Sequence, residues 1–363
     1  MGQHGRMRQP TPAPVMTDVA RLAGVSHQTV SRVVNDSPHV SGPTRAKVLA
    51  AMEQLGYRRN GVARALARRR SGTLGVLTFD TVLYGPVSTL YSVEQAASSV
   101  GLGVTIAVVE QVAADDVVRA LARLQDQSVE GVIALAPQRD AVDTLIEALR
   151  STPSVFVGGV IGGSAADATP FPAGALPPAV GIDQRGGGAA ATRHLLELGH
   201  RTVHHLAGPQ DYLDALWRTE GWRDTLRAAS APVPAPQFGD WSARSGYAAM
   251  GRLLAADPDL TAVFVGNDQM ALGALRALDA AGRAIPGDVS VVGFDDIPEA
   301  EFFGPPLTTV RQGFTEAGRR AVAMLMDMIR PDGADSAPAV EEPLVRTELL
   351  VRWSTGPGPA ARP

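Results

Sequence analysis

The sequence contains no cysteine among its 363 residues. Disulfide bonds, thiolate metal sites and cysteine nucleophiles are therefore excluded together. Lysine is almost as scarce, because Lys47 is the only one in the chain. The rest of the sequence thus offers no lysine for a phosphate-binding P-loop or for a Schiff base, which argues against a P-loop NTPase or an aldolase-type enzyme.

Long apolar runs are also missing. No stretch approaches the roughly 18–20 apolar residues that a helix needs to cross a bilayer, so we expect no membrane partner. The opening MGQHGRMRQPTPAP has no apolar segment after its positive charges, so we expect no secretory signal and a cytoplasmic protein. Hydrophobic residues make up 45% of the chain and charged residues 19%, as in soluble globular proteins. At this length we expect two or three domains.

Charge is distributed unevenly along the chain. Residues 1–70 contain 12 Arg and Lys against 3 Asp and Glu, whereas the remainder contains 21 against 34. A basic N-terminal segment on an acidic body is typical of a nucleic-acid-binding module joined to another domain. Taken alone, the charge fits a solvated basic face equally well.

Two short helices are predicted in the basic segment. Thr17 is placed to cap a helix over DVARLA, which Gly24 ends, and Ser26 is placed to cap a second helix, HQTVSRVVN. Two helices joined by such a turn form a helix-turn-helix motif, whose second helix lies in the DNA major groove. A third helix follows, with Ser41 as its cap and Gly56 at its end.

The second of these helices has an apolar side and a polar side. Val30, Val33 and Val34 are spaced to pack against the first helix. Glutamine pairs well with adenine and arginine with guanine, so the polar side is suited to reading bases. The side chains expected on it are His27, Gln28, Ser31 and Arg32, with Asn35 in reach of phosphate.

The segment YRRNGVARALARRRSG connects this unit to the body. Asn60 is a good cap for a helix over VARALA, but about eight residues are too few for a stable isolated helix. We expect the helix to form only together with a symmetric partner and DNA. Leu66 is an apolar side chain flanked by arginines, which is typical of a wedge inserted into the minor groove. A basic flexible linker explains the composition equally well.

From residue 72 onward, short apolar runs alternate with helical stretches. Strands interleaved with helices predict parallel sheets covered on both faces, and the length favours two lobes. Ligands bind such folds beyond the carboxyl ends of the strands. The predicted strands are LGVLTF, VTIAVV, GVIALA, SVFVGG, AVGID, TVHHLAG, QFGDW, AVFVGN, VSVVGFDD and TTVRQ.

Acidic and amide side chains follow several of these strands. We expect some of them to cap helices, Asp268 among them, and others to bind a ligand. Trp241 offers an apolar face to the C–H groups of a sugar, and the guanidinium of Arg218 is suited to grip hydroxyls or a carboxylate. The strand-end residues are Asp80, Asp183, Asn267, Asp268, Asp295 and Asp296.

Three other signals are weaker. RGGGAAATRHL lacks the G-x-G-x-x-G spacing of a dinucleotide site. His194, His200, His204 and His205 are interpreted as core or surface histidines rather than metal ligands, since the chain has no cysteine and a strand is predicted there. No nucleophile elbow is present, and adjacent Asp295 and Asp296 do not flank a substrate as a glycosidase pair must. We therefore expect no metal, no cofactor and no enzyme.

The quoted N-terminal motifs resemble the DNA-binding region of the LacI/GalR family of transcriptional repressors. The resemblance continues through the body, from about Gly72 to Arg352, in GDWSARSGY, GNDQMALGALRAL, VSVVGFDD and PPLTTVRQGF. It implies an all-α helix-turn-helix head and an α/β two-lobed body with the periplasmic-binding-protein-like fold of parallel sheets. The implied divisions are a disordered tail at 1–14, the head at 15–59, a hinge helix at 60–70, the body at 71–355 (lobe 1 about 72–182 and 314–340, lobe 2 about 183–312 and 341–355) and a disordered tail at 356–363.

The resemblance also implies roles for individual residues. The second helix reads the operator and Leu66 wedges into its centre, which gives a DNA-binding set of Thr17, His27, Gln28, Ser31, Arg32, Asn35, Tyr57, Asn60 and Leu66. Arg218, Asn267 and Asp295 are implied to bond sugar hydroxyls, with Trp241 stacked on the ring. The residues implied to border the cleft are Gln312, Phe314, Leu83, Pro86 and Asp80.

The chain departs from the family pattern at several places. Gly158 stands where the resemblance places an aspartate on the sugar, and Ile182 where it places a pocket phenylalanine. GGSAADATPFPAGALPP between them is predicted to be a surface loop. The ending STGPGPAARP has no apolar heptads and excludes a C-terminal coiled coil, so we expect a homodimer.

The function expected from all this is repression of sugar-utilisation genes. A dimer binds a near-palindromic double-stranded operator, and a small sugar effector, a galactoside first among candidates, releases it. A nucleobase co-repressor acting on the same fold remains open. A sugar-binding transport protein and a sugar-active enzyme are less favoured alternatives.

Overall fold

The computed structural model describes residues 14–34, 37–57, 70–79, 82–109, 113–135, 138–159, 178–330 and 344–359. The chain divides into two compact units, Met1–Ser71 and Gly72–Pro363. Several predicted features lie outside the described residues. They are Asn35, Asn60, Leu66, Asp80, the predicted hinge helix up to residue 69, nearly all of the predicted loop at 162–178, and both chain ends.

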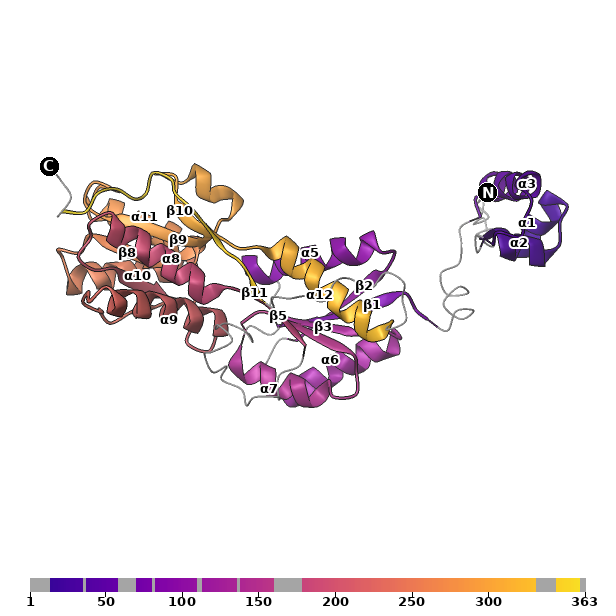
Figure 1. The fold of residues 1–363 in the computed structure, drawn as a ribbon, viewed down its shortest axis with the longest axis horizontal. Helices are drawn as coiled ribbons and strands as arrows, with labels where there is room; N and C mark the ends of the chain where they lie inside the picture. The colour runs from indigo at the N-terminus through magenta and orange to yellow at the C-terminus, as the bar shows by residue number, and fades with distance from the viewer. Residues whose placement is uncertain are drawn as a thin grey trace, which may run out of the picture. The chain divides into compact units, whose positions relative to one another are not determined.

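In the described residues of the N-terminal unit, three helices pack around one core (Figure 1). Gly24 ends the first helix with a φ of 66°, and the Ser26 Oγ accepts a 3.1 Å hydrogen bond from Thr29 N, which confirms both predicted signals. Val19, Val30 and Val33 are fully buried and form the centre of the core. The helices are α1 (Met16–Ala23), α2 (His27–Val34) and α3 (Gly42–Leu55).

Thr17 does not cap α1, contrary to the prediction. The helix begins at Met16, so Thr17 lies inside the first turn and is exposed. The carboxylate of Asp18 instead accepts a 3.0 Å hydrogen bond from the backbone N–H of Val15. An acidic side chain in the first turn also complements the positive end of the helix dipole. The helix therefore begins two residues before the start that a Thr17 cap implies.

The first lobe of the body is a six-stranded parallel sheet between two layers of helices (Figure 1). Alternate strand residues point to opposite faces, and each face has its own buried cluster. The strands lie in the order β11 (Leu344–Val345), β5 (Ala179–Ile182), β4 (Ser154–Val157), β3 (Val132–Leu135), β1 (Thr73–Thr78) and β2 (Gly103–Val108). One face is covered by α6 (Ala114–Asp126) and α7 (Arg139–Ala148), the other by α5 (Tyr84–Ser99) and α12 (Phe314–Ile329).

The second lobe repeats this plan with one antiparallel edge. Val263 and Val265 face one helical layer, while Ala262 and Phe264 face the other. The strands lie in the order β12 (Glu348–Leu350), β10 (Thr308–Arg311), β9 (Ser290–Asp295), β8 (Ala262–Val265), β6 (His204–Ala207) and β7 (Gln237–Phe238). The layers are α10 (Ala243–Ala256) with α11 (Asp268–Ala280), and α8 (Gln184–Glu197) with α9 (Leu213–Ala228); the short η1 (Pro298–Phe302) follows β9.

All ten predicted strands are present, but the last part of the chain was assigned wrongly. Residues 341–355 were predicted to belong to lobe 2 alone. Leu344 and Val345 instead pair with β5 at the edge of the first sheet, and only from Glu348 does the chain join the second sheet. The chain thus crosses between the lobes three times, after β5, after β10 and after β11. Two-residue strands carry too little periodicity for a sequence pattern to detect.

Residues 356–359 are ordered on the second lobe, although a disordered tail was predicted to begin at 356. Gly356 N donates a 3.0 Å hydrogen bond to Ser290 Oγ, and His200 Nε2 lies 3.2 Å from Gly356 O. Gly358 packs so closely on the backbone of Gly199 that a Cβ atom there would lie 2.5 Å from it. Glycine, interpreted as a sign of disorder, here permits close backbone packing. Within the described ranges, none of the helices has the length and apolar character needed to cross a bilayer.

Candidate functional site

A cleft lies between the two lobes of the body, at the carboxyl ends of their strands. Its open space, part of it continuous with solvent, is about 740 Å³. Every predicted ligand residue that the structure describes lines it, namely Leu83, Pro86, Arg218, Trp241, Asn267, Asp295, Gln312 and Phe314.

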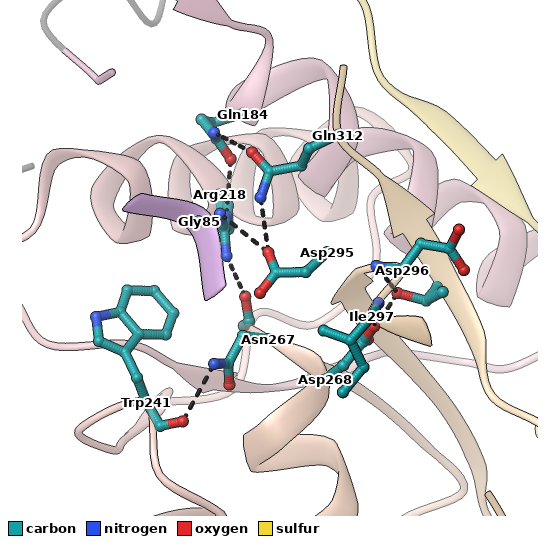
Figure 2. A network of polar contacts seen from close by, with 12 residues as sticks. Gly85, Gln184, Arg218, Trp241, Asn267, Asp268, Asp295, Asp296, Ile297 and Gln312 are labelled. Atoms are coloured by element: carbon teal, nitrogen blue, oxygen red, sulfur yellow. Dashed lines mark hydrogen bonds and ion pairs between the residues drawn. The ribbon is translucent and has the colours of Figure 1, made fainter. Parts of the chain in front are cut away.

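Arg218, on α9, is the centre of a buried polar network (Figure 2). Its Nε donates a 2.8 Å hydrogen bond to Gln184 Oε1, its Nη1 donates to Gly266 O, and its Nη2 lies 3.6 Å from Asp295 Oδ1. The guanidinium carbon also lies 3.9 Å from the ring centroid of Phe294. Because the three nitrogens all have partners and the charge lies over an aromatic face, a buried arginine is tolerated here.

Two glutamines close this network into a ring. Gln184 Nε2 donates a 2.7 Å hydrogen bond to Gln312 Oε1, and Gln312 Nε2 donates a 2.6 Å hydrogen bond to Asp295 Oδ1 (Figure 2). Burial raises the pKa of Asp295 to about 6, although Arg218 and the bond from Gln312 act to lower it. The Asp295 carboxylate is therefore an acceptor whose charge depends on pH near neutrality.

Asn267 both caps a helix and lines the cleft. Its Oδ1 accepts a 2.9 Å hydrogen bond from Met270 N at the start of α11, and its Nδ2 donates a 3.1 Å bond to Trp241 O. Trp241 and Asp295 have positive φ angles of 73° and 116°, a region that side-chain-bearing residues rarely adopt. The surrounding bonds thus maintain two cleft residues in strained conformations, as is frequent at functional sites.

Asp268 does not cap α11, contrary to the prediction. It is fully buried, and its carboxylate accepts hydrogen bonds from Thr309 Oγ1 at 2.7 Å and from Ile297 N at 3.0 Å. Burial, and next the charge of Asp295, raise its pKa well above the ordinary value. The preceding residue, Asn267, has the extended backbone of an N-cap, so Asp268 is the first residue of the helix and is directed toward β10 instead.

The first lobe supplies the apolar wall of the cleft. Leu83, Tyr84 and Pro86 come from the start of α5, and Phe314 from the start of α12. The rings of Tyr84 and Phe314 meet edge to face, with centroids 5.9 Å apart. Opposite them is Trp241, whose ring meets that of Tyr212 edge to face at 5.8 Å. A ligand in the cleft therefore has hydrogen-bonding groups mainly on the second lobe and aromatic faces on both.

The glycine run after β5 positions α9, and with it Arg218. A Cβ atom at Gly188 would lie 2.4 Å from Arg218 O, and one at Gly221 would lie 2.1 Å from Arg185 O. The two helices can approach this closely only because both positions lack a side chain. The run RGGGAAATRHL thus serves helix packing.

The histidines at 194, 200, 204 and 205 have structural roles. His205 is buried and stacked on Phe264 at 4.6 Å, and its Nε2 lies 3.2 Å from Thr219 Oγ1. Burial lowers the pKa of His205 to about 4, so the ring is neutral. Over the parts of the chain that the structure describes, no group of His, Asp and Glu side chains is arranged to hold a metal ion.

The N-terminal domain presents the predicted polar face. His27, Gln28 and Arg32 are exposed on α2, and Ser31 is half-buried. Tyr57 follows α3 and packs its ring against the edge of the domain core. The side chains therefore point as a DNA-reading helix requires, with the valines on the opposite side.

Comparison with known proteins agrees with this arrangement. Residues 15–60 match the family described as bacterial regulatory proteins, lacI family, and residues 192–355 match the periplasmic binding protein-like domain. The lactose operon repressor of Escherichia coli (strain K12) is 36% identical over 339 residues, which are 93% of this chain and 91% of the relative. The chain belongs to the LacI family. It is therefore a DNA-binding transcription regulator and not an enzyme.

Two further relatives are similar along most of their length. The regulator CelR of Thermobifida fusca is 36% identical over 356 residues, covering 94% of this chain and 98% of the relative. The repressor PurR of Haemophilus influenzae (strain ATCC 51907 / DSM 11121 / KW20 / Rd) is 30% identical over 344 residues, covering 93% and 97%. These relatives support the assignment of the chain to the LacI family, but they are named as different regulators.

Solved structures of LacI-family members share the fold. The lac repressor dimer bound to operator and the anti-inducer ONPF superposes with a TM-score of 0.80 at 34% identity, covering 94% of this chain and 99% of that one. The complex of CelR with cellobiose gives a TM-score of 0.66 at 34% identity, with the same coverage. These titles describe the relatives, one with DNA and one with a disaccharide.

Sequence reasoning missed several cleft residues, among them Tyr84, Gln184, Tyr212 and Asp214. Attention to Asp and Asn after strands selected Asp183, which caps α8 by accepting a 2.7 Å hydrogen bond from Gly186 N, and passed over Gln184 beside it. Asp214 lies four residues before Arg218 on α9, and this spacing places both on one helix face. Helical periodicity, applied once Arg218 was selected, would have found Asp214.

Proposed function

We propose that this LacI-family regulator is a homodimeric repressor of sugar-utilisation genes, released from a near-palindromic operator by a small sugar. The observation that carries the proposal is the ring of Gln184, Gln312, Asp295 and Arg218 beside the indole of Trp241. Amide, carboxylate and guanidinium groups together accept and donate hydrogen bonds to vicinal hydroxyls, while an aromatic face packs on sugar C–H groups.

On the DNA side, His27, Gln28, Ser31 and Arg32 are the residues we expect to meet base edges. Two α2 helices of a dimer would then lie about one helical turn of DNA apart, about 34–36 Å. Thr17 and Tyr57 are proposed to contact the operator backbone. We propose DNA-binding roles for Asn35, Asn60 and Leu66 as well, which lie outside the described residues.

The two functions are coupled through the lobes. A sugar that bridges the cleft favours one arrangement of the lobes, and this arrangement separates the two hinge segments of the dimer. Operator affinity falls as a result, and by linkage operator binding weakens sugar binding by the same factor.

The test is a titration of the protein–operator complex with sugars. A duplex that the protein selects from a random pool serves as operator, and galactosides and cellobiose are added first while release is followed by fluorescence anisotropy. Release at saturating sugar is expected. If operator affinity stays constant at saturating concentrations of every sugar that binds, the proposed coupling is wrong.

A second candidate is a nucleobase co-repressor that tightens operator binding. The aromatic side chains of Tyr84, Tyr212, Trp241 and Phe314 around the cleft favour it, because a planar base stacks between such rings. A thermal-shift screen of sugars against purines separates the two candidates. A purine that raises the melting temperature, and sugars that do not, would select the co-repressor.

A further inference from the structure

Asp214 is a second carboxylate in the cleft, and the polar network does not use it. It lies in the first turn of α9 and lines the cleft beside Arg218. Its Oδ1 atom is buried and has no hydrogen-bond partner. Leaving a buried acceptor unpaired costs on the order of 1–3 kcal/mol, and more for a charged one, so native structures contain few such atoms without a reason.

Close packing confines this carboxylate to its place. A Cβ atom at Gly159, after β4, would lie 2.6 Å from Asp214 Oδ1 and 2.9 Å from Asp214 N. The first turn of α9 can therefore approach the end of β4 only because residue 159 is glycine. Trp217 Nε1 donates a 2.8 Å hydrogen bond to Gly159 O and fixes this approach.

The neighbouring guanidinium is already engaged. Arg218 directs its three nitrogens to Gln184, Gly266 and Asp295, while the half-buried Asp214 lies one turn before it on the same helix. Burial raises the pKa of Asp214, while Arg218 acts to lower it. On this side of the cleft, Asp214 Oδ1 is therefore an acceptor that no donor among the described residues reaches.

Trp241 has the complementary unpaired group, a hydrogen-bond donor. Its indole Nε1 is buried without an acceptor, although Asn267 bonds to its backbone oxygen. Among the described residues of the cleft, one acceptor and one donor are therefore both left over. A hydroxyl group both donates and accepts, so a polyhydroxylated ligand suits this pair better than a hydrocarbon does.

We propose that Asp214 selects the effector by accepting a hydrogen bond from a donor group that the sugar directs at the first turn of α9. This inference rests on the proposed function, because it takes a sugar to be the ligand of the cleft. The donor is a ring hydroxyl or a protonated amino group, since both present an N–H or O–H to a carboxylate.

The experiment is calorimetric titration of the full chain with methyl β-galactoside, cellobiose and galactosamine. Asp214→Ala and Asp214→Asn are compared with Asp211→Asn, whose aspartate is exposed and lies outside the cleft. We expect Asp214→Ala to weaken binding of the preferred sugar about 10-fold or more, and Asp211→Asn to leave it unchanged. Preference for galactosamine identifies the donor as an amine, and preference for a neutral sugar identifies it as a hydroxyl.

The melting temperature of the ligand-free protein provides an independent test. Since Asp214 is unpaired without ligand, Asp214→Asn is expected to keep or raise the melting temperature while it lowers sugar affinity. A lower melting temperature, with equal loss of affinity for every sugar, would indicate a structural role and overturn the inference. So would unchanged affinity in both Asp214 variants.

Failure of the proposed function has a different signature. Sugar binding that depends on Asp214 but does not release the operator would refute the coupling and leave the inference standing. If none of the three sugars binds the unaltered chain, the proposed sugar effector and the role of Asp214 are both refuted.

Discussion

Gln184 and Gln312 are joined by a 2.7 Å hydrogen bond although 128 residues separate them in sequence. Each lies where the chain passes between the lobes, Gln184 after β5 and Gln312 after β10. The bond therefore ties two of the three crossings together at the base of the cleft. A ligand that contacts either side chain therefore also contacts a segment that connects the two lobes.

Gln184→Leu is predicted to weaken both effector binding and the body itself. The change leaves the Nε–H of Arg218 and the Oε1 of Gln312 without their partner, at a cost on the order of 1–3 kcal/mol. Effector affinity, measured by calorimetry, should fall about 10-fold. Gln125→Leu, at an exposed position of α6, is the matched control. Equal behaviour of the two variants would contradict the prediction.

Effector affinity is predicted to fall as the pH is lowered through about 6. Burial raises the pKa of Asp295 to about 6, and the protonated carboxyl accepts hydrogen bonds less well than the carboxylate. Calorimetric titrations from pH 5 to pH 8 measure the effect. Asp295→Asn should bind weakly at every pH and lose the transition. An unaltered transition in that variant would assign it to another group.

The same raised pKa has a consequence for stability. An acid whose pKa is higher in the folded than in the unfolded chain binds more protons when folded. The free energy of unfolding therefore falls as the pH rises from about 4 to about 6, by about 1.4 kcal/mol per pH unit at most. Asp295→Asn should reduce this slope in urea unfolding, because only the raised pKa values of Asp214 and Asp268 then contribute to it. The variant should also be more stable than the unaltered chain at pH 8.

His205 is predicted to act in the opposite direction. Burial lowers its pKa to about 4. Below about pH 6.5, His205 therefore binds a proton in the unfolded chain but not in the folded chain. Its contribution to stability is present above pH 6.5 and is lost toward pH 4. In His205→Gln this loss should disappear, whereas His39→Gln, at an exposed position, should retain it. The free energy of unfolding in urea, measured for both variants between pH 4.5 and pH 8, tests this prediction.

Gln28→Ala and Arg32→Ala are predicted to weaken operator binding without unfolding the head. Both side chains are exposed on α2, opposite the buried Val30 and Val33. Each lost base contact should cost about 1–3 kcal/mol and relax specificity at one base pair. Gln54→Ala, exposed on α3, is the control in anisotropy titrations. A uniform loss across all DNA sequences would show that the residues contact phosphate instead.

Gly221→Ala is predicted to disturb the site from a distance. The added Cβ would lie 2.1 Å from Arg185 O, so α8 and α9 must separate and Arg218 must move. A loss of about 1–3 kcal/mol in unfolding free energy and weaker effector binding should follow. Gly251→Ala adds its methyl group to open space on α10, and should leave binding unchanged with up to about 1 kcal/mol of added stability.

The fold was predictable from the sequence where the pattern was strong. Ten apolar runs with helices between them indicated parallel sheets, and ten strands are found there. The helix-turn-helix followed from Gly24, Ser26 and the valine spacing. What the pattern missed are β11 and β12, two and three residues long, whose pairing depends on tertiary contacts rather than on periodicity.

The site was predictable only in part. Arg218, Trp241, Asn267 and Asp295 were selected by chemical type and position, and all four line the cleft. Asp268 was misassigned because a carboxylate at a helix start has two possible partners, and only the packing of β10 decides between them. Whether an acceptor is left unpaired, as at Asp214, depends on three-dimensional contacts that no local pattern contains.

The last strands also determine the order in which a newly made chain can be completed on the ribosome. Helices α1 to α3 can assemble as soon as the first 57 residues have emerged, because their core is local. The first lobe must wait for α12 to cover its sheet, and then for Leu344 and Val345 to pair with β5. A chain that stops shortly before β11 would thus have a folded helix-turn-helix domain on a body with an open edge in each sheet.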